Sequence, residues 1–147
     1  MILDIDNQTE LALETAMLEK IASDLTAAPI ELIVVNDGDI KRLNQAHRGK
    51  EKATDVLSFP LEASFTETSV FGMPLGSIVI SADHVMAKAK MYGHTPQDEF
   101  ALLFIHGLLH LLGYDHEKDD GEMRAKEREL IEKWQLPASL IVRTEEK

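Results

Sequence analysis

One helix places the strongest constraint on how this chain can fold. Thr95 is a favourable N-cap, Pro96 takes the first helical position and Asp98 adds a carboxylate to the first turn, so a helix should begin there. Residues 100–112 that follow are apolar almost all round, and Gly113 provides a C-terminal stop. A helix without a polar face belongs in the core, so other elements must cover it.

Periodicity and turn residues predict the elements around that helix. Short strands are predicted where β-branched and apolar residues cluster, at residues 2–5, 30–35, 56–59 and 78–80. Four further helices are predicted. The first begins at a capping box at residues 7–10, and the second extends from Ile40 to His47. The third extends from Ser81 to Met91, and the last from Asp119 or Asp120 to Trp134. The order β α β α β β α α α predicts an α+β fold, a small mixed sheet of about four strands packed with about five helices. The long connection at residues 61–75 is predicted to be a functional or mobile loop.

Length and composition limit the classes of protein that this chain can represent. Its 147 residues fit a single domain, and 44% apolar with 28% charged residues is a globular composition. The chain has no cysteine, so any metal must be held by His, Asp or Glu. The N-terminus lacks a cationic segment, and no apolar run approaches the roughly 18 to 20 residues of a membrane span. We therefore expect a cytoplasmic protein.

The charge is distributed unevenly. A net charge of −11 argues against a surface coated with basic residues for binding nucleic acid. Residues 1–39 hold nine carboxylates and one lysine, a local net charge of −8. Residues 40–52 reverse the sign to +4, with one carboxylate against five cations: Lys41, Arg42, Arg48, Lys50 and Lys52. An acidic molecule thus carries one small basic segment.

Three of the six histidines lie close together on the core helix and the turn after it: His106, His110 and His116. Residues four apart on a helix have Cβ atoms about 5 to 6 Å from each other, so the first two can hold one ion. The chain turns at Gly113, which can bring the third imidazole to the same point. Three neutral nitrogen donors and one open position are typical of a catalytic zinc site.

An alternative is that these histidines are hydrogen-bonded core residues or a solvent-facing stripe. Burying two imidazoles on an apolar helix is costly unless something binds them, so metal binding is favoured. Zinc is the first candidate, although imidazole also suits nickel, copper and iron. Gly107 costs about 1 kcal/mol against alanine within a helix. It is therefore predicted to allow backbone or substrate to approach beside the metal, the alternative being close helix packing.

The same histidine spacing occurs in the metzincin frame His-Glu-x-x-His-x-x-Gly-x-x-His. Gly107 stands where those peptidases have their glutamate base, which disfavours a metallopeptidase without eliminating it. Glu99 and Asp115 are possible substitutes, but Glu99 is more simply a solvated first-turn charge. Asp115 either orients a ligand histidine or caps the turn. The remaining histidines lack ligand spacing and are predicted to lie at the surface: His47, His84 and His94.

The segment 106–116, HGLLHLLGYDH, resembles the signature of the YbeY family, metal-dependent endoribonucleases of bacterial ribosomal RNA maturation. A second block is similar to the upstream motif of that family: Leu43-Asn44, Arg48 and the run TDVLSFP at residues 54–60. The segments GSIVIS at 76–81 and YGH at 92–94 also agree. The resemblance extends from about residue 30 to residue 135.

The resemblance implies that residues 1–147 form a single YbeY-like metallohydrolase domain, with His106, His110 and His116 as ligands of one zinc ion. It implies that Arg48 is the catalytic arginine of the cleft, where a planar guanidinium can bind two phosphate oxygens. The implied activity is cleavage of single-stranded RNA in 16S rRNA 3′-end maturation and ribosome quality control. The implied partners are the 16S rRNA precursor and the small ribosomal subunit with its proteins, without DNA or a membrane.

Two positions depart from the family pattern. His47 stands where tyrosine is frequent, and Ser77 stands where aspartate is common. The four other cations of the basic segment either follow the RNA backbone or are simply solvated. A zinc-dependent endoribonuclease is the leading hypothesis. The alternatives are a metzincin-like metallopeptidase and a non-catalytic ribosome-assembly factor that contains a structural metal and binds RNA without cutting it.

Overall fold

A computed structural model describes residues 2–48, 56–60, 75–114 and 121–136. These residues form four strands and five helices, which confirms the predicted α+β class with a small mixed sheet. The elements in chain order are β1 Leu3–Asn7, α1 Thr15–Leu25, β2 Ile30–Val35, α2 Asp37–Arg48, β3 Val56–Pro60, β4 Gly76–Ser81, α3 Ala82–Tyr92, α4 Pro96–Leu111 and α5 Glu122–Lys133. Most of the predicted loop at 61–75 lies outside the described residues.

The sheet is parallel except at one edge. Its strand order is β1-β2-β4-β3, where β1, β2 and β4 are parallel and β3 runs antiparallel to β4. Ile30 of β2 pairs with Leu3 on one side and Gly76 on the other, while Val56 of β3 pairs with Ile80. The parallel pair β1 and β2 is joined through α1, as a parallel crossover requires.

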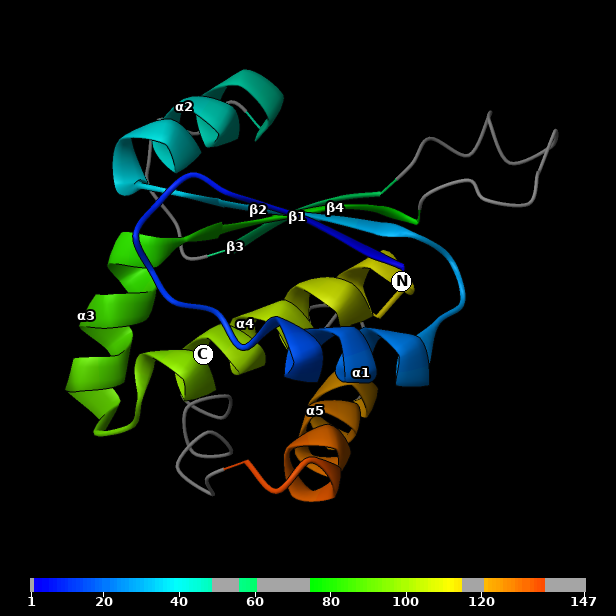
Figure 1. Cartoon of the computed structure of the whole chain (residues 1–147). Helices are drawn as coiled ribbons and strands as arrows, with labels where there is room; N and C mark the ends of the chain where they lie inside the picture. The colour runs from blue at the N-terminus through cyan, green and yellow to red at the C-terminus, as the bar shows by residue number, and fades with distance from the viewer. Residues whose placement is uncertain (1, 49–55, 61–74, 115–120, 137–147) are drawn as a thin grey trace, which may run out of the picture.

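The helices cover the two faces of the sheet unequally. Figure 1 shows α2 alone on one face and α1, α3, α4 and α5 on the other. Because side chains alternate along a strand, Ile78 and Ile80 of β4 belong to the large core beneath the sheet. Val79 points the other way and joins a small cluster with Ile40 of α2. The fold therefore has one large core and one small one.

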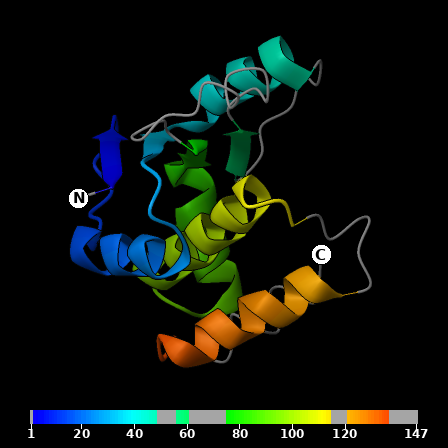
Figure 2. The same ribbon diagram turned by 90° about the vertical axis from the view of Figure 1, so that its right-hand side faces the viewer.

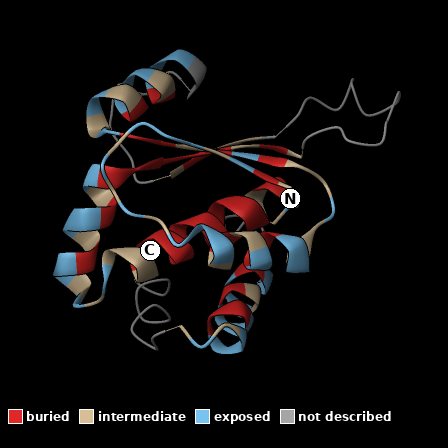
Figure 3. Cartoon of the chain, viewed as in Figure 1, coloured by how far each residue is buried: buried red, intermediate tan, exposed pale blue. Residues whose placement is uncertain are grey.

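Helix α4 runs through the large core, as its apolar sequence predicts. Residues 99–109 are all buried, and its ribbon is the most continuously buried of the helices in Figure 3. The Thr95 hydroxyl accepts a hydrogen bond from the backbone N–H of Asp98 at 3.1 Å, and Gly113 adopts a positive φ of 103° just beyond the end. Both predicted ends of this helix are confirmed.

Gly107 is the point of closest approach between α4 and the sheet. A Cβ atom there would lie 2.9 Å from Ile78 Cγ2 and 3.2 Å from Ser58 Oγ. The Ser58 hydroxyl also donates a hydrogen bond to the Gly107 carbonyl at 3.1 Å. The neighbours that require glycine are therefore side chains of β3 and β4. Close helix packing, the alternative to an approach beside the metal, is the reason for this residue.

The capping box predicted at residues 7–10 is wrong. Asn7 ends β1, and its Oδ1 accepts hydrogen bonds from the backbone N–H of Thr9 at 3.0 Å and from the Thr9 hydroxyl at 2.7 Å. Asparagine bonded to the backbone two residues ahead makes a turn, which competes with helix initiation. Helix α1 begins only at Thr15. The predicted start of the last helix, at Asp119 or Asp120, lies outside the described residues. In the described part of the chain, α5 begins at Glu122.

In the described part of the chain, no helix is both long and apolar enough to span a bilayer. The longest of these helices is α4, with 16 residues. Its apolar surface is covered by the sheet and by neighbouring helices.

Replacing Gly107 with alanine should destabilise the protein. Overpacking against Ile78 and Ser58 costs about 1 to 3 kcal/mol, more than the roughly 1 kcal/mol that alanine gains in helix propensity. Gly38→Ala in α2 is the matched control, since a Cβ there meets only Asn36 Oδ1 at 3.4 Å. Urea unfolding should show a lower midpoint for Gly107→Ala and an equal or higher one for Gly38→Ala. A Gly107→Ala protein as stable as the wild type would contradict the packing role.

Candidate metal centre

His106 and His110 lie one turn apart near the end of α4. Their ring centroids are 4.8 Å apart, and the rings meet edge to face with an interplanar angle of 76°. His106 is buried, at 6% exposure, whereas His110 in the last turn is half-buried. The structure thus brings the first two predicted ligands together, with the more accessible one at the end of the helix.

The contact that supports His106 comes from α5. Oε1 of Glu127 lies 3.4 Å from Nδ1 of His106, and the two side chains are 4% and 8% exposed. The sequence pattern alone does not single out Glu127, because α5 carries many charged residues. One signal was present: Glu127 occupies the same helical stripe as Met123, Leu130 and Ile131, which are all buried.

Glu99 and His94 are not surface residues, so both predictions for them are wrong. Glu99 is fully buried, and its Oε1 lies 2.7 Å from Nε2 of His94, whose side chain is only 2% exposed. The reason is the turn at Gly93, where a φ of 73° ends α3 and directs the chain back over the first turn of α4. Glu99 lies two turns before His106, about 10 Å along the helix axis, and engages His94 instead of the predicted ligands.

Several predicted site residues lie outside what the structure describes. These are His116 and Asp115, two further cations of the basic segment, Lys50 and Lys52, and the side chains of His47 and Arg48. Among the described residues, no three side chains of the ligand types gather around one point. The three-histidine site is therefore represented by two of its members.

The backbone of Arg48 ends α2, on the opposite face of the sheet from α4. Figure 2 shows the last turns of both helices directed toward the β3 edge, one above the sheet and one below it. In the same helix, Lys41 is exposed and Arg42 forms an ion pair with Asp39.

His84 contacts the start of α2, and Ser77 lies on the face of β4 that is turned toward α2. Nδ1 of His84 lies 2.6 Å from Oδ1 of Asp37, which also accepts the Ser81 hydroxyl proton at 2.5 Å. This cluster joins the starts of α2 and α3. Ser77 donates a hydrogen bond to Glu31 on β2 at 2.7 Å. Its side chain points to the α2 face, so position 77 does not reach His106 beneath the sheet.

The donors that the structure describes suit a divalent transition metal. Imidazole nitrogen is a common ligand of zinc, and a ligand histidine typically donates its other ring N–H to a carboxylate or carbonyl. Glu127 faces Nδ1 of His106, the ring nitrogen that a metal bound through Nε2 would not use. The chemistry of the pair on α4 therefore agrees with the predicted site.

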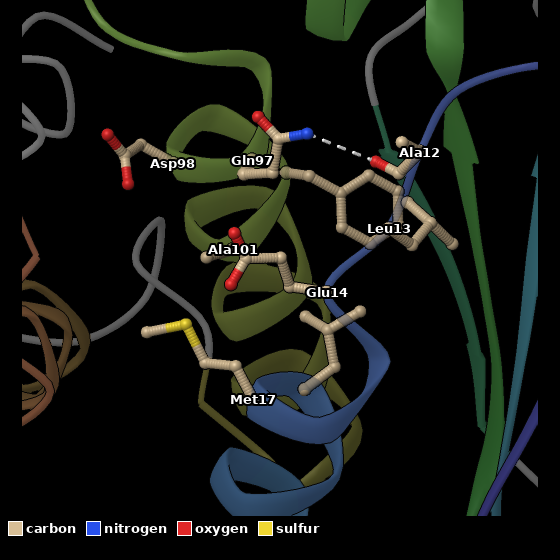
Figure 4. A pocket seen from close by; sticks show the side chains of 9 residues that line it. Ala12, Leu13, Glu14, Met17, Gln97, Asp98 and Ala101 are labelled. Atoms are coloured by element: carbon tan, nitrogen blue, oxygen red, sulfur yellow. Dashed lines mark hydrogen bonds between the residues drawn. The ribbon is translucent and has the colours of Figure 1, made fainter.

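An open cleft lies elsewhere, between the segment that leads into α1 and the start of α4 (Figure 4). Leu13, Met17 and Phe100 line it, Gln97 donates a hydrogen bond to the Ala12 carbonyl across it at 3.4 Å, and its charged residues are Glu14 and Asp98. Asp98 and His110 are about 18 Å apart along the helix axis. The cleft is thus separate from the histidines, and its carboxylates would repel phosphate.

Comparisons with known proteins agree on one family. The family model described as Endoribonuclease YbeY matches residues 3–135. A Sulfurovum sp. protein named Endoribonuclease YbeY is 61% identical over 144 residues, 98% of each chain. Proteins of the same name from Wolinella succinogenes and Helicobacter pylori are 54% and 53% identical, and the alignments cover 99% of this chain and 99% and 100% of theirs.

A solved structure supports the fold. The solution structure of a Thermotoga maritima protein is similar to this chain with a TM-score of 0.58 and 29% sequence identity. The alignment covers 93% of this chain and 94% of that protein. The likeness therefore extends over nearly the whole chain.

Removing the buried partner of Glu99 should lower stability strongly. His94→Ala leaves a carboxylate in the core without its imidazole partner, and breaking a buried pair of this kind costs about 3 kcal/mol or more. His84→Ala is the control, because its partner Asp37 has a side chain that is 43% exposed and its loss should cost about 1 kcal/mol or less. Equilibrium unfolding in urea would measure both variants. Equal, small losses would show that the His94 pair is not a stabilising contact.

Proposed function

Because the chain belongs to the YbeY endoribonuclease family, we propose that it is a metal-dependent endoribonuclease that cleaves single-stranded RNA. The observation that carries the proposal is the pair of histidines on α4, which belong to the family's motif. Relatives that align over nearly the full length of this chain are named Endoribonuclease YbeY. The paired rings supply donors for a metal at an accessible end of a buried helix.

The metal in this proposal is one zinc ion, held by His106, His110 and His116. When bound, such an ion polarises a phosphoryl oxygen and lowers the pKa of bound water to about 7. His106 and His110 contribute from adjacent turns of α4, which the core holds rigidly. His116 belongs to the segment between α4 and α5, so a ligand from there would connect the two helices.

Arg48 is the proposed catalytic arginine. Its guanidinium would bind two phosphate oxygens of the RNA backbone and neutralise charge that develops there during cleavage. Its place at the end of α2 supports this role, because α2 and α4 end at the same edge of the sheet (Figure 2). The basic segment around it, with a local net charge of +4, favours a polyanion at that edge.

The proposed substrate is the 16S rRNA precursor, cleaved during 3′-end maturation and ribosome quality control in the cytoplasm. The proposed partners are the small ribosomal subunit and its proteins. The family resemblance of two separate motifs supports this role, and the net charge of −11 is compatible with it. An acidic surface weakens indiscriminate RNA binding, so recognition would depend on the small site and on ribosomal partners.

A metallopeptidase is the less favoured alternative. Gly107 replaces the glutamate base of the metzincin frame and is committed to packing against Ile78 and Ser58. Glu99, the possible substitute, is engaged with His94 two turns away. The histidine frame remains the only feature in favour of peptide hydrolysis among the described residues, and the same assays distinguish the two activities.

His110→Ala should lose both the metal and RNA cleavage. The residue is half-buried in the last turn of α4, so alanine removes a donor without opening the centre of the core. Elemental analysis should find less than one ion per chain, and a fluorescent single-stranded RNA should stay intact. Casein, incubated with the wild-type protein in parallel, tests for peptidase activity. Stoichiometric metal in the variant would exclude the three-histidine site. Wild-type protein that binds metal and RNA but cuts neither substrate would indicate an assembly factor.

Arg48→Glu should keep the metal and the fold but lose RNA cleavage by about 100-fold or more, the scale of removing one charge-stabilising donor. Lys41→Glu makes the same charge change at an exposed position of the same helix and should reduce cleavage much less. Single-turnover cleavage rates at fixed salt would measure the difference. Undiminished cleavage by Arg48→Glu would remove Arg48 from the mechanism.

A further inference from the structure

Two carboxylates are buried among the described residues, Glu99 and Glu127, and each faces a histidine. Burying a carboxylate is costly unless a partner compensates for the lost hydration. Glu99 faces His94, which is not a predicted ligand. Glu127 faces His106, the first predicted ligand, and comes from a different helix. Its position in the stripe of Met123, Leu130 and Ile131 would otherwise suit an apolar side chain.

We propose that Glu127 is a positioning residue for the metal site. Its carboxylate accepts a hydrogen bond from Nδ1–H of His106, and the ring is thereby held with Nε2 toward the metal. This inference rests on the proposed metal site. A neutral imidazole carries one proton, and the nitrogen that holds it is set by the hydrogen bond that it makes. A carboxylate can only accept, so Glu127 selects the tautomer in which Nδ1 carries the proton and Nε2 carries the lone pair that a metal can bind.

The geometry allows this bond with a small adjustment. The distance of 3.4 Å between Nδ1 and Oε1 exceeds the usual hydrogen-bond range of about 2.7 to 3.2 Å by a few tenths of an ångström. Because the two side chains are only 8% and 4% exposed, water competes little for either atom.

The charge of Glu127 also favours a cation at this place. Neutral imidazole ligands leave the full +2 of a divalent ion uncompensated in a largely apolar environment. A carboxylate behind the first ligand reduces the local sum to +1 and makes the imidazole a stronger donor. A positioning role explains why Glu127 is charged although it lies among the buried residues of α5. From that place it faces His106 where α5 packs on α4.

Glu127→Gln is the decisive variant, since glutamine keeps the shape but loses the charge. Its amide can also donate to Nδ1, which would favour the wrong tautomer. Zinc affinity, measured by competition with a chromophoric chelator, should fall about 10- to 100-fold. Glu129→Gln on the same helix is the control: Glu129 is 61% exposed and pairs with Lys126 at the surface, so zinc affinity should not change.

A second measurement does not depend on the metal. In the chelator-treated protein, ¹⁵N NMR should show His106 protonated at Nδ1 in the wild type and shifted toward Nε2 protonation in Glu127→Gln. A purely structural role would lower the unfolding midpoint without moving this tautomer. Equal zinc affinity in Glu127→Gln, or an unresponsive His106 tautomer, overturns the positioning role. A wild-type chain that binds no zinc overturns the proposed function instead, while the tautomer still tests Glu127.

Discussion

The close approach of α4 to the sheet at Gly107 determines where the rest of the site can lie. With no side chain at that position, the helix lies against Ile78 of β4 and Ser58 of β3, and the Ser58 hydroxyl binds its backbone. Successive helical residues point about 100° apart, so the rotation of α4 fixed at Gly107 also fixes the direction of His106 toward α5. The packing of Gly107 thus sets the orientation of His106, a candidate metal ligand.

Both carboxylates that are buried among the described residues face a histidine from another part of the fold. Glu99 receives its partner from the turn after α3, and His106 receives its partner from α5. Such pairs contribute little net stability compared with well-packed apolar side chains. Their retention on an otherwise apolar helix is therefore easier to explain by function near His106 than by stability, whereas Glu99 and His94 join α3 to the start of α4.

Local signals predicted α4 well, because its cap at Thr95, its apolar run and Gly113 act within a few residues of each other. The capping box at residues 7–10 was wrong, because the same local residue types also suit a turn. Asn7 and Thr9 are hydrogen-bonded to each other in such a turn. The burial of Glu99 and the partner of His106 depend on tertiary contacts that no local pattern contains. The ligand role of His116 and the catalytic role of Arg48 stay predictions.

The unequal covering of the sheet has a consequence for motion. Helix α2 is held by a cluster of four buried residues, Val35, Ile40, Leu57 and Val79, whereas α4 lies in the large core. Elements with little buried apolar contact open at lower free energy, so amide hydrogens of α2 should exchange with solvent well before those of α4. The two helices that end at the β3 edge would then differ in rigidity: α4 would stay fixed, while α2 would move more easily relative to the sheet.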